Sequence, residues 1–191
     1  MATPTTLPAS FTSGQVLTAA QMNNLRGAFR VLQVVNTIKS DTFVSGSVSQ
    51  GGSTDITGMT ASITPSSTSS KVLVTFSVYG QIYIVNAAFG AMSITCSRGA
   101  TLIGVGDAAG SRTRVTGQNG IFTSGNGFSH VAASILDSPN TTSTTTYKLS
   151  CVHTNWGSSA GSFYINRAFD DGDASSVPRA ASFMTLMEIS A

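Results

Sequence analysis

Side chains able to carry acid–base chemistry are few in this chain of 191 residues, which contains two histidines and a single glutamate, Glu188. Ser129 precedes His130, and His153 with Asp170 could be imagined as parts of a hydrolase triad. A serine nucleophile, however, needs a strand–turn–helix context that aims its hydroxyl, and the pattern along the chain offers none. We therefore expect no enzymatic activity and no cofactor, with both histidines in structural or interface roles.

Two further segments resemble ligand sites only superficially. Gly104 to Gly110 is glycine-rich, but its spacing differs from that of a nucleotide-binding loop and no helix is expected to follow it, so it predicts a hairpin turn. Asp170, Asp171 and Asp173 place three carboxylates within four residues, which suits a hard cation such as calcium. The usual ligand spacing of a calcium loop is missing, and turns also favour Asp and Gly. We expect a solvated turn without metal, and keep a calcium site as the alternative.

The single tryptophan, Trp156, follows an expected strand and precedes a Gly/Ser turn. An exposed indole ring packs well on the apolar face of a sugar ring, and Tyr164 and the loop from Asn119 to Asn126 could add contacts. The sequence thus raises the hypothesis of a saccharide contact at Trp156. The alternative is that Trp156 closes one end of a hydrophobic core.

Composition narrows the class of protein. Only 9% of the residues are charged, with ten Lys and Arg against eight Asp and Glu, whereas an average soluble domain has about 25%. The low number of charged residues and their near-equal signs exclude a basic nucleic-acid binder, an acidic disordered tail and a coiled coil. No apolar run approaches the roughly 18 residues of a membrane span, and the N-terminal residues lack the pattern of a secretory signal. So few charges favour a protein that hides much of its surface in an assembly.

The cysteines, Cys96 and Cys151, are too few and too far apart for a disulfide scaffold or a zinc site. We expect two reduced, buried thiols. A disulfide between them is the alternative if the strands that carry them pair.

Residues 1–30 differ from the remainder. Pro4 and Pro8 favour an extended start, and Thr18 with Gln21 forms a capping box for a short helix. That helix places Met22, Leu25 and Phe29 in one apolar stripe. A helix of about three turns is not stable alone in water, so we expect it to dock on another surface.

From Val31 to the C-terminus the apolar residues alternate with period two. In Lys71–Tyr79, for example, four apolar side chains alternate with outward residues: Val72, Val74, Phe76 and Val78. Many such runs, separated by Gly, Ser, Asn and Asp turns, predict an all-β antiparallel sandwich or jelly roll over residues 31–191. The last run, Phe183 to Ile189, is apolar on both faces, which indicates that a neighbouring subunit covers one sheet. We expect Met184, Leu186 and Tyr164 in that interface.

Three segments of the sequence resemble parts of tailed-bacteriophage virion proteins. The first is residues 11–25, which read FTSGQVLTAAQMNNL; the second comprises residues 31–35 and 55–74, and the third is the closing residues 179–189. The resemblance implies an N-terminal virion-attachment segment followed by a trimeric jelly-roll domain of tumour-necrosis-factor-like type. The attachment residues would be Phe11, Val16, Leu17, Met22, Leu25 and Phe29.

The function that this resemblance implies is structural. We expect a short trimeric fibre or knob of a virion, made in the bacterial cytoplasm, which binds copies of itself and other virion proteins and contacts a host-surface saccharide. It would bind neither nucleic acid nor membrane. One alternative is a decoration protein that cements the capsid shell, and another is a soluble lectin-like binding module.

Overall fold

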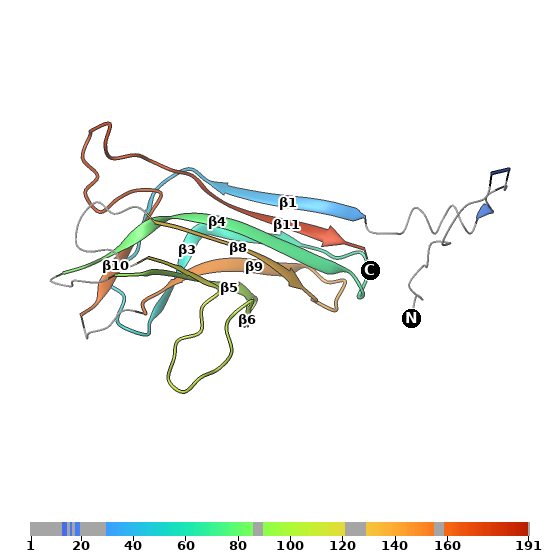
Figure 1. Cartoon of the computed structure of the whole chain (residues 1–191), viewed down its shortest axis with the longest axis horizontal. Helices are drawn as coiled ribbons and strands as arrows, with labels where there is room; N and C mark the ends of the chain where they lie inside the picture. Colours follow the sequence, from blue (N-terminus) through green and yellow to red (C-terminus); the bar gives the residue numbers. More distant parts are fainter. Residues whose placement is uncertain are drawn as a thin grey trace.

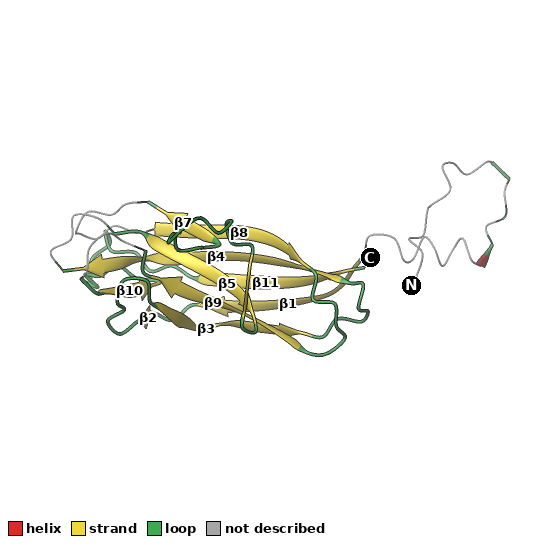
Figure 2. Cartoon of the chain, turned by 90° about the horizontal axis from the view of Figure 1, so that it is seen from below, coloured by secondary structure: helices red, strands yellow, loops and turns green. Residues whose placement is uncertain are grey.

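The computed structural model of the chain describes residues 30–85, 90–120, 129–154 and 159–190, together with five residues between 13 and 19. The helix expected around Met22, Leu25 and Phe29 lies outside the described residues. Within them the structure is a sandwich of two antiparallel sheets, seen from two directions in Figures 1 and 2. The prediction of an all-β antiparallel sandwich is confirmed.

Eleven strands form in the described part of the chain. They are β1 (Val31–Lys39), β2 (Phe43–Val44), β3 (Ser53–Ile63), β4 (Lys71–Ile84), β5 (Met92–Arg98), β6 (Thr101–Ile103), β7 (Gly117–Asn119), β8 (Ser129–Asp137), β9 (Thr145–Val152), β10 (Gly161–Ile165) and β11 (Ser182–Ile189). The six-stranded sheet has the order β1-β11-β4-β10-β2, and β8 also pairs with β4. The five-stranded sheet has the order β3-β9-β5-β6, and β7 also pairs with β5.

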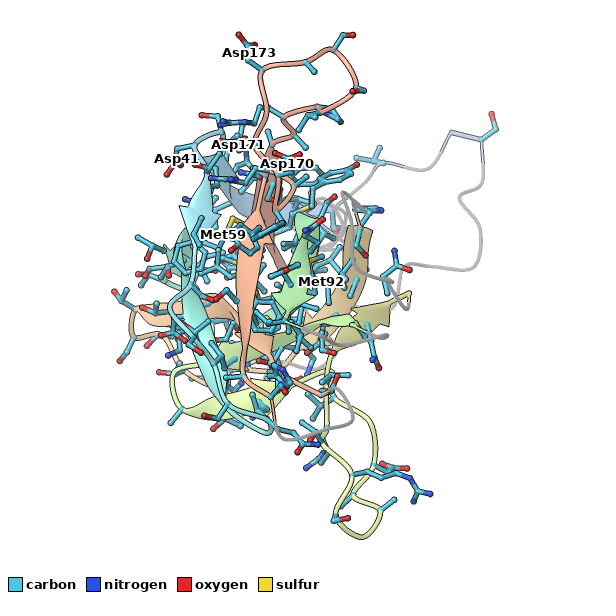
Figure 3. The ribbon with its side chains drawn as sticks, turned by 90° about the vertical axis from the view of Figure 1, so that its left-hand side faces the viewer. Asp41, Met59, Met92, Asp170, Asp171 and Asp173 are labelled. Atoms are coloured by element: carbon cyan, nitrogen blue, oxygen red, sulfur yellow. The ribbon has the colours of Figure 1, made fainter. Side chains whose placement is uncertain are left out.

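The core lies between the two sheets and follows the predicted alternation. Val72, Val74, Phe76 and Val78 of β4 are all buried. They belong to one cluster with residues of the other sheet, among them Met59 and Met92, which Figure 3 shows inside the sandwich when it is viewed from one end. Burial of these apolar side chains supplies most of the free energy of folding.

Both cysteines belong to this core as free thiols, as predicted. Their strands, β5 and β9, do pair, but Cys96 lies opposite Leu149 and Cys151 lies opposite Ile94. The two sulfur atoms are thus offset along the ladder. Burial raises the pKa of the Cys96 thiol to about 12 and also raises that of Cys151, so both thiols stay protonated and unreactive.

Strand β4 is the centre of the six-stranded sheet. The sequence predicts two strands here, at 71–79 and 81–85, but the structure has one continuous strand through Gly80. Along one side of β4, residues 71–77 pair with β11 and residues 80–84 pair with β10. Gly80 lies where β10 takes over, and a Cβ atom there would collide with the carbonyl oxygen of Tyr164. The close approach of the two backbones therefore requires glycine.

Asn166 follows the last residue of β10 and begins the loop that leads to β11. Its hydrogen bonds hold the end of β10 in place. Its side-chain Nδ2 donates to the carbonyl oxygens of Lys39 and Asp41, at 2.8 and 2.9 Å. Its Oδ1 accepts a hydrogen bond from the Ser182 hydroxyl at 2.6 Å, and its backbone N–H donates to the Tyr79 carbonyl. The residue is fully buried with a φ of 62°, a left-handed conformation that asparagine tolerates better than other non-glycine residues.

We predict that Asn166→Ala destabilises the fold by about 3–5 kcal/mol, since it removes three buried hydrogen bonds and leaves their partners unsatisfied. Asn140→Ala is the matched control, because Asn140 also has a positive φ, 53°, but is exposed. The control should lose only about 1 kcal/mol of conformational preference. Denaturant unfolding of both variants measures the difference, and equal losses would refute the role assigned to the Asn166 side chain.

Glu188, the single glutamate, forms a second polar cluster toward the other end of β11. It is fully buried and accepts hydrogen bonds from Gln33 Nε2 at 2.6 Å and from the Ser66 N–H and hydroxyl, each at 2.7 Å. Burial alone would raise the pKa of this carboxyl, but the hydrogen bonds from Gln33, Ser66 and Ser70 outweigh it and lower the pKa to about 2. The carboxylate thereby joins β1, β11 and the loop between β3 and β4.

A carboxyl group whose pKa is lower in the folded than in the unfolded state stabilises the fold at pH values above its unfolded pKa. For Glu188 this stabilisation is complete above pH 4.5 and is lost as the pH falls towards 2. We expect wild type to lose roughly 2–3 kcal/mol more than Glu188→Gln across this interval. Urea unfolding of both proteins at pH 5 and at pH 2.5 tests this difference. Parallel losses in the two proteins would show that Glu188 is not the group responsible.

Candidate functional site

The outer faces of the two sheets differ in chemistry. On the five-stranded sheet the outward side chains are mainly polar and hydrogen-bond to one another across the strands. The pairs are Ser62 with Thr146, Asp55 with Lys148 and Ser150, and Ser93 with Thr154. Leu102 on β6 is an exposed apolar exception. The outward residues of β5, Ser93, Thr95 and Ser97, are nevertheless buried, so the exposed polar residues of this face come mainly from β3.

The outer face of the six-stranded sheet is mainly apolar. Residues directly opposite one another on antiparallel strands point to the same side, so the register defines rows of side chains across β1, β11, β4 and β8. One row contains Val34, Met187, Leu73 and Leu136; the row two residues further contains Asn36, Thr185, Thr75 and Ser134; and the next contains Ile38, Phe183, Ser77 and Ala132. We call the six large apolar residues of these rows the apolar face: Val34, Ile38, Leu73, Leu136, Phe183 and Met187.

Several side chains of the apolar face are more accessible than is usual for such residues. The exposed fraction is 66% for Ile38, 62% for Leu136, 55% for Val34 and 42% for Phe183. Among the outward residues of the same four strands, Lys71 and His130 are the only basic ones, and they lie toward opposite ends of β4 and β8. Two rows of exposed large apolar side chains, separated by an uncharged polar row, indicate a site of protein interaction.

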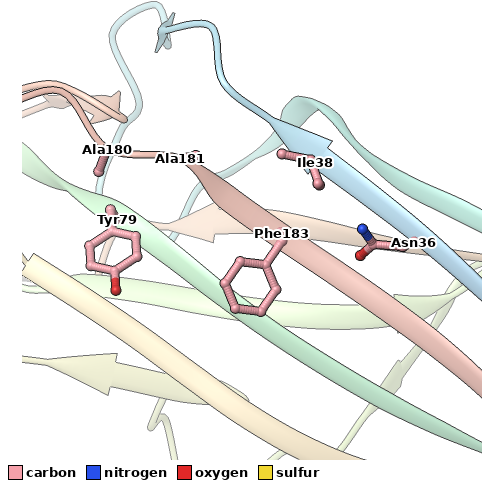
Figure 4. A pocket seen from close by; sticks show the side chains of 6 residues that line it. All are labelled: Asn36, Ile38, Tyr79, Ala180, Ala181 and Phe183. Carbon is pink, nitrogen blue, oxygen red and sulfur yellow. The ribbon is translucent and has the colours of Figure 1, made fainter.

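A shallow hollow of about 550 Å³ lies beside this face (Figure 4). Its lining is largely apolar and comes from β1, β4 and the start of β11: Asn36, Ile38, Tyr79, Ala180, Ala181 and Phe183. Two alanines in sequence, immediately before β11, leave room between the larger side chains. The hollow is of a size to receive one or more apolar side chains of a partner.

The assignment of Met184 and Leu186 to a subunit interface is wrong. Both side chains are fully buried in the core of a single chain, and the outward residues of β11 are Phe183, Thr185, Met187 and Ile189. The sequence is apolar on both faces of this strand, so alternation alone cannot tell which face meets the core. Tyr164 does point outward on β10, where its ring meets that of Phe169 edge to face at 5.4 Å.

The groups considered for catalysis lie on different elements: Ser129 and His130 on β8, His153 just after β9, and Asp170 in the loop after β10. His130 is on the outer face of β8, with Nε2 2.7 Å from the Ser77 hydroxyl and its ring stacked on Tyr79. His153 follows β9, is 1% exposed, and has no hydrogen-bond partner on either ring nitrogen within the described residues. Burial lowers the pKa of His153 and so favours its neutral form. Asp170 lies on the exposed loop after β10.

The sequence also contains one motif typical of serine hydrolases that the predicted elements do not reveal. Residues 157–161 read Gly-Ser-Ser-Ala-Gly, which is the spacing of a nucleophile elbow. Such an elbow joins a strand to a helix, whereas Gly161 begins strand β10. The described part of this segment therefore lacks the helix that a serine nucleophile requires.

The three aspartates considered for calcium do not form a cation site among the described residues. Asp171 pairs through its Oδ2 with two arginines, at 3.3 Å from Arg167 and 2.6 Å from Arg179. Asp170 and Asp173 are exposed on the same loop, at the periphery of the molecule in Figure 3. No group of three potential metal ligands occurs in the part of the chain that the structure describes.

Trp156 and five of the expected attachment residues lie outside the described residues: Phe11, Leu17, Met22, Leu25 and Phe29. The sixth, Val16, is 87% exposed. In the described residues no helix has the length and hydropathy needed to cross a membrane. No protein-family model and no curated protein matches this sequence.

Proposed function

We propose that this protein is a structural component of a tailed-phage virion, a short homotrimeric fibre or knob held to the particle by residues 1–30. The observation that carries the proposal is the apolar face, which a single chain leaves exposed to water. The resemblance of residues 11–25 to attachment segments of virion proteins supports the location. The low charge of the chain and its jelly-roll-like sandwich are compatible with self-association and with a place in a virion.

Burial of the apolar face between copies of the chain would favour permanent assembly. If neighbouring copies bury roughly 1,000 Å² of apolar area, the gross gain at about 25 cal/mol per Å² is near 25 kcal/mol. Lost rigid-body and side-chain freedom offsets much of this gain. The remainder is sufficient for a stable complex, and the hollow beside Phe183 offers the place where a neighbour's side chain would insert.

The positions of the two ends of the β domain support one orientation of the proposed fibre on a particle. Arg30, just before β1, and Ser190, just after β11, are hydrogen-bonded neighbours: the Ser190 N–H donates to the Arg30 carbonyl at 2.9 Å, and the Arg30 N–H donates to the Ser190 hydroxyl at 3.0 Å. The β domain is thus entered and left at one end (Figure 1). In the proposed fibre, residues 1–30 hold that end and the opposite end, with β10 and Tyr83, points outward.

We predict that Phe183→Asp combined with Val34→Asp converts the trimer into folded monomers, because two carboxylates would be desolvated in the contact. Both side chains are exposed in the single chain, so the fold itself should lose less than about 1 kcal/mol. Thr146→Asp, on the polar face of the other sheet, is the matched control and should remain trimeric. Sedimentation equilibrium measures the mass; a 19.6 kDa wild-type monomer would contradict the proposal.

For the attachment segment we predict that Leu25→Asp or Phe29→Asp leaves the β domain folded and trimeric but abolishes incorporation into particles. A charge in the apolar stripe opposes docking on another virion protein. Thr5→Asp serves as the control outside the stripe. Quantitative mass spectrometry of purified particles measures copy number: few copies indicate a tail or neck position, whereas many would favour the decoration protein of the shell. Normal incorporation of both variants would exclude the stripe as the anchor.

A further inference from the structure

Three aromatic rings meet on the outer side of the six-stranded sheet at the end away from Arg30. The rings of Tyr83 on β4 and Phe169 in the loop after β10 stack with centroids 3.7 Å apart and planes only 6° from parallel. Tyr164 on β10 meets Phe169 edge to face. Phe169 is 37% exposed, and both tyrosines are partly exposed. We call these three residues the aromatic platform.

A cluster of charged side chains that pair with one another adjoins the platform at Tyr164. The Arg167 guanidinium lies over the Tyr164 ring, 5.5 Å from its centroid, and pairs with Asp171. Arg179 pairs with the same carboxylate and keeps 56% of its side chain exposed. Neither the Tyr83 nor the Tyr164 hydroxyl hydrogen-bonds to another described residue. The partly exposed rings thus lie near two phenol hydroxyls and the exposed part of the Arg179 side chain.

From this arrangement we propose that the aromatic platform binds a neutral hexopyranoside. The C–H face of a sugar ring is apolar and flat, so it packs on an aromatic face, while its ring-edge hydroxyls need donors and acceptors at the rim. Arg179 and the two phenols supply them. The three aspartates of the loop outnumber its two arginines, so the local charge gives no attraction for an acidic sugar.

The residues proposed here to contact a saccharide differ from those that the sequence suggests. The sequence suggests a saccharide contact at Trp156, with Tyr164 as an added contact, whereas in the described structure Tyr164 lies with Tyr83 and Phe169. This inference deepens the proposed function and rests on it for the outward direction of this end. Sugar binding itself is measured on the purified chain, separately from oligomeric mass and from incorporation into particles.

The test is ligand-observed NMR titration of the full chain with the methyl glycosides of glucose, galactose, mannose and N-acetylglucosamine. We expect at least one glycoside to bind, and Phe169→Ala and Arg179→Gln each to weaken it by about tenfold, the change expected when one good contact is lost. Leu102→Ala, an exposed apolar residue on the other sheet, is the matched control and should bind as wild type. Thermal unfolding and sedimentation of each variant check its fold and mass.

Binding that is lost in both platform variants, with fold and mass unchanged, supports the proposal. It is overturned if none of the four glycosides binds, if the platform variants bind as tightly as Leu102→Ala, or if Phe169→Ala instead dissociates the oligomer, which would make the platform part of the subunit contact. Should Phe169→Ala fail to fold, Arg179→Gln alone decides between these outcomes. A wild-type monomer that binds sugar through these residues would overturn the homotrimer and not the platform.

Discussion

The hydrogen bonds of Asn166 are the interaction on which the six-stranded sheet depends. Strands β10 and β11 lie end to end along the same side of β4, so the chain must leave the sheet after Ile165 and return at Ser182 without leaving backbone groups unpaired. Asn166 resolves this by binding the Tyr79 backbone, the end of β1 and Ser182 at once. Buried polar groups must find hydrogen-bond partners. One asparagine in a left-handed conformation therefore sets where β10 ends and where β11 begins.

The arrangement of these strands determines the chemistry of the outer surface. Once β11 is fixed with Met184 and Leu186 inward, Phe183 and Met187 must point outward, beside Val34 and Ile38 of β1. The polar positions of the other sheet are occupied by serine and threonine, which form short hydrogen bonds across strands and need few ionic groups. The low overall charge of the chain therefore goes together with an uneven distribution of side chains, in which the outward residues of one sheet are mainly polar and those of the other are mainly apolar and exposed.

Much of the fold could be predicted from the sequence because the alternation in strands such as β4 has one dominant apolar face. Prediction fails where that contrast vanishes. In β11 both faces are apolar, so the core residues Met184 and Leu186 are assigned to the interface. Gly80 is taken for a break, although it is the residue that lets two backbones approach. The aromatic platform could not be foreseen, since Tyr83, Tyr164 and Phe169 come together only through the pairing of β4 with β10 and the course of the loop beyond it.

The neighbouring positions of Arg30 and Ser190 bear on how the molecule could be modified. A reporter domain fused after β11 would emerge next to the segment that precedes β1 and would crowd whatever that segment binds. The loop of residues 104–116, by contrast, projects from the flank of the sandwich between β6 and β7 (Figure 1) and is mostly exposed. Exposed loop tips tolerate insertions best. A peptide epitope carried there would be presented without disturbing either the strand ladders or the entry point of the chain.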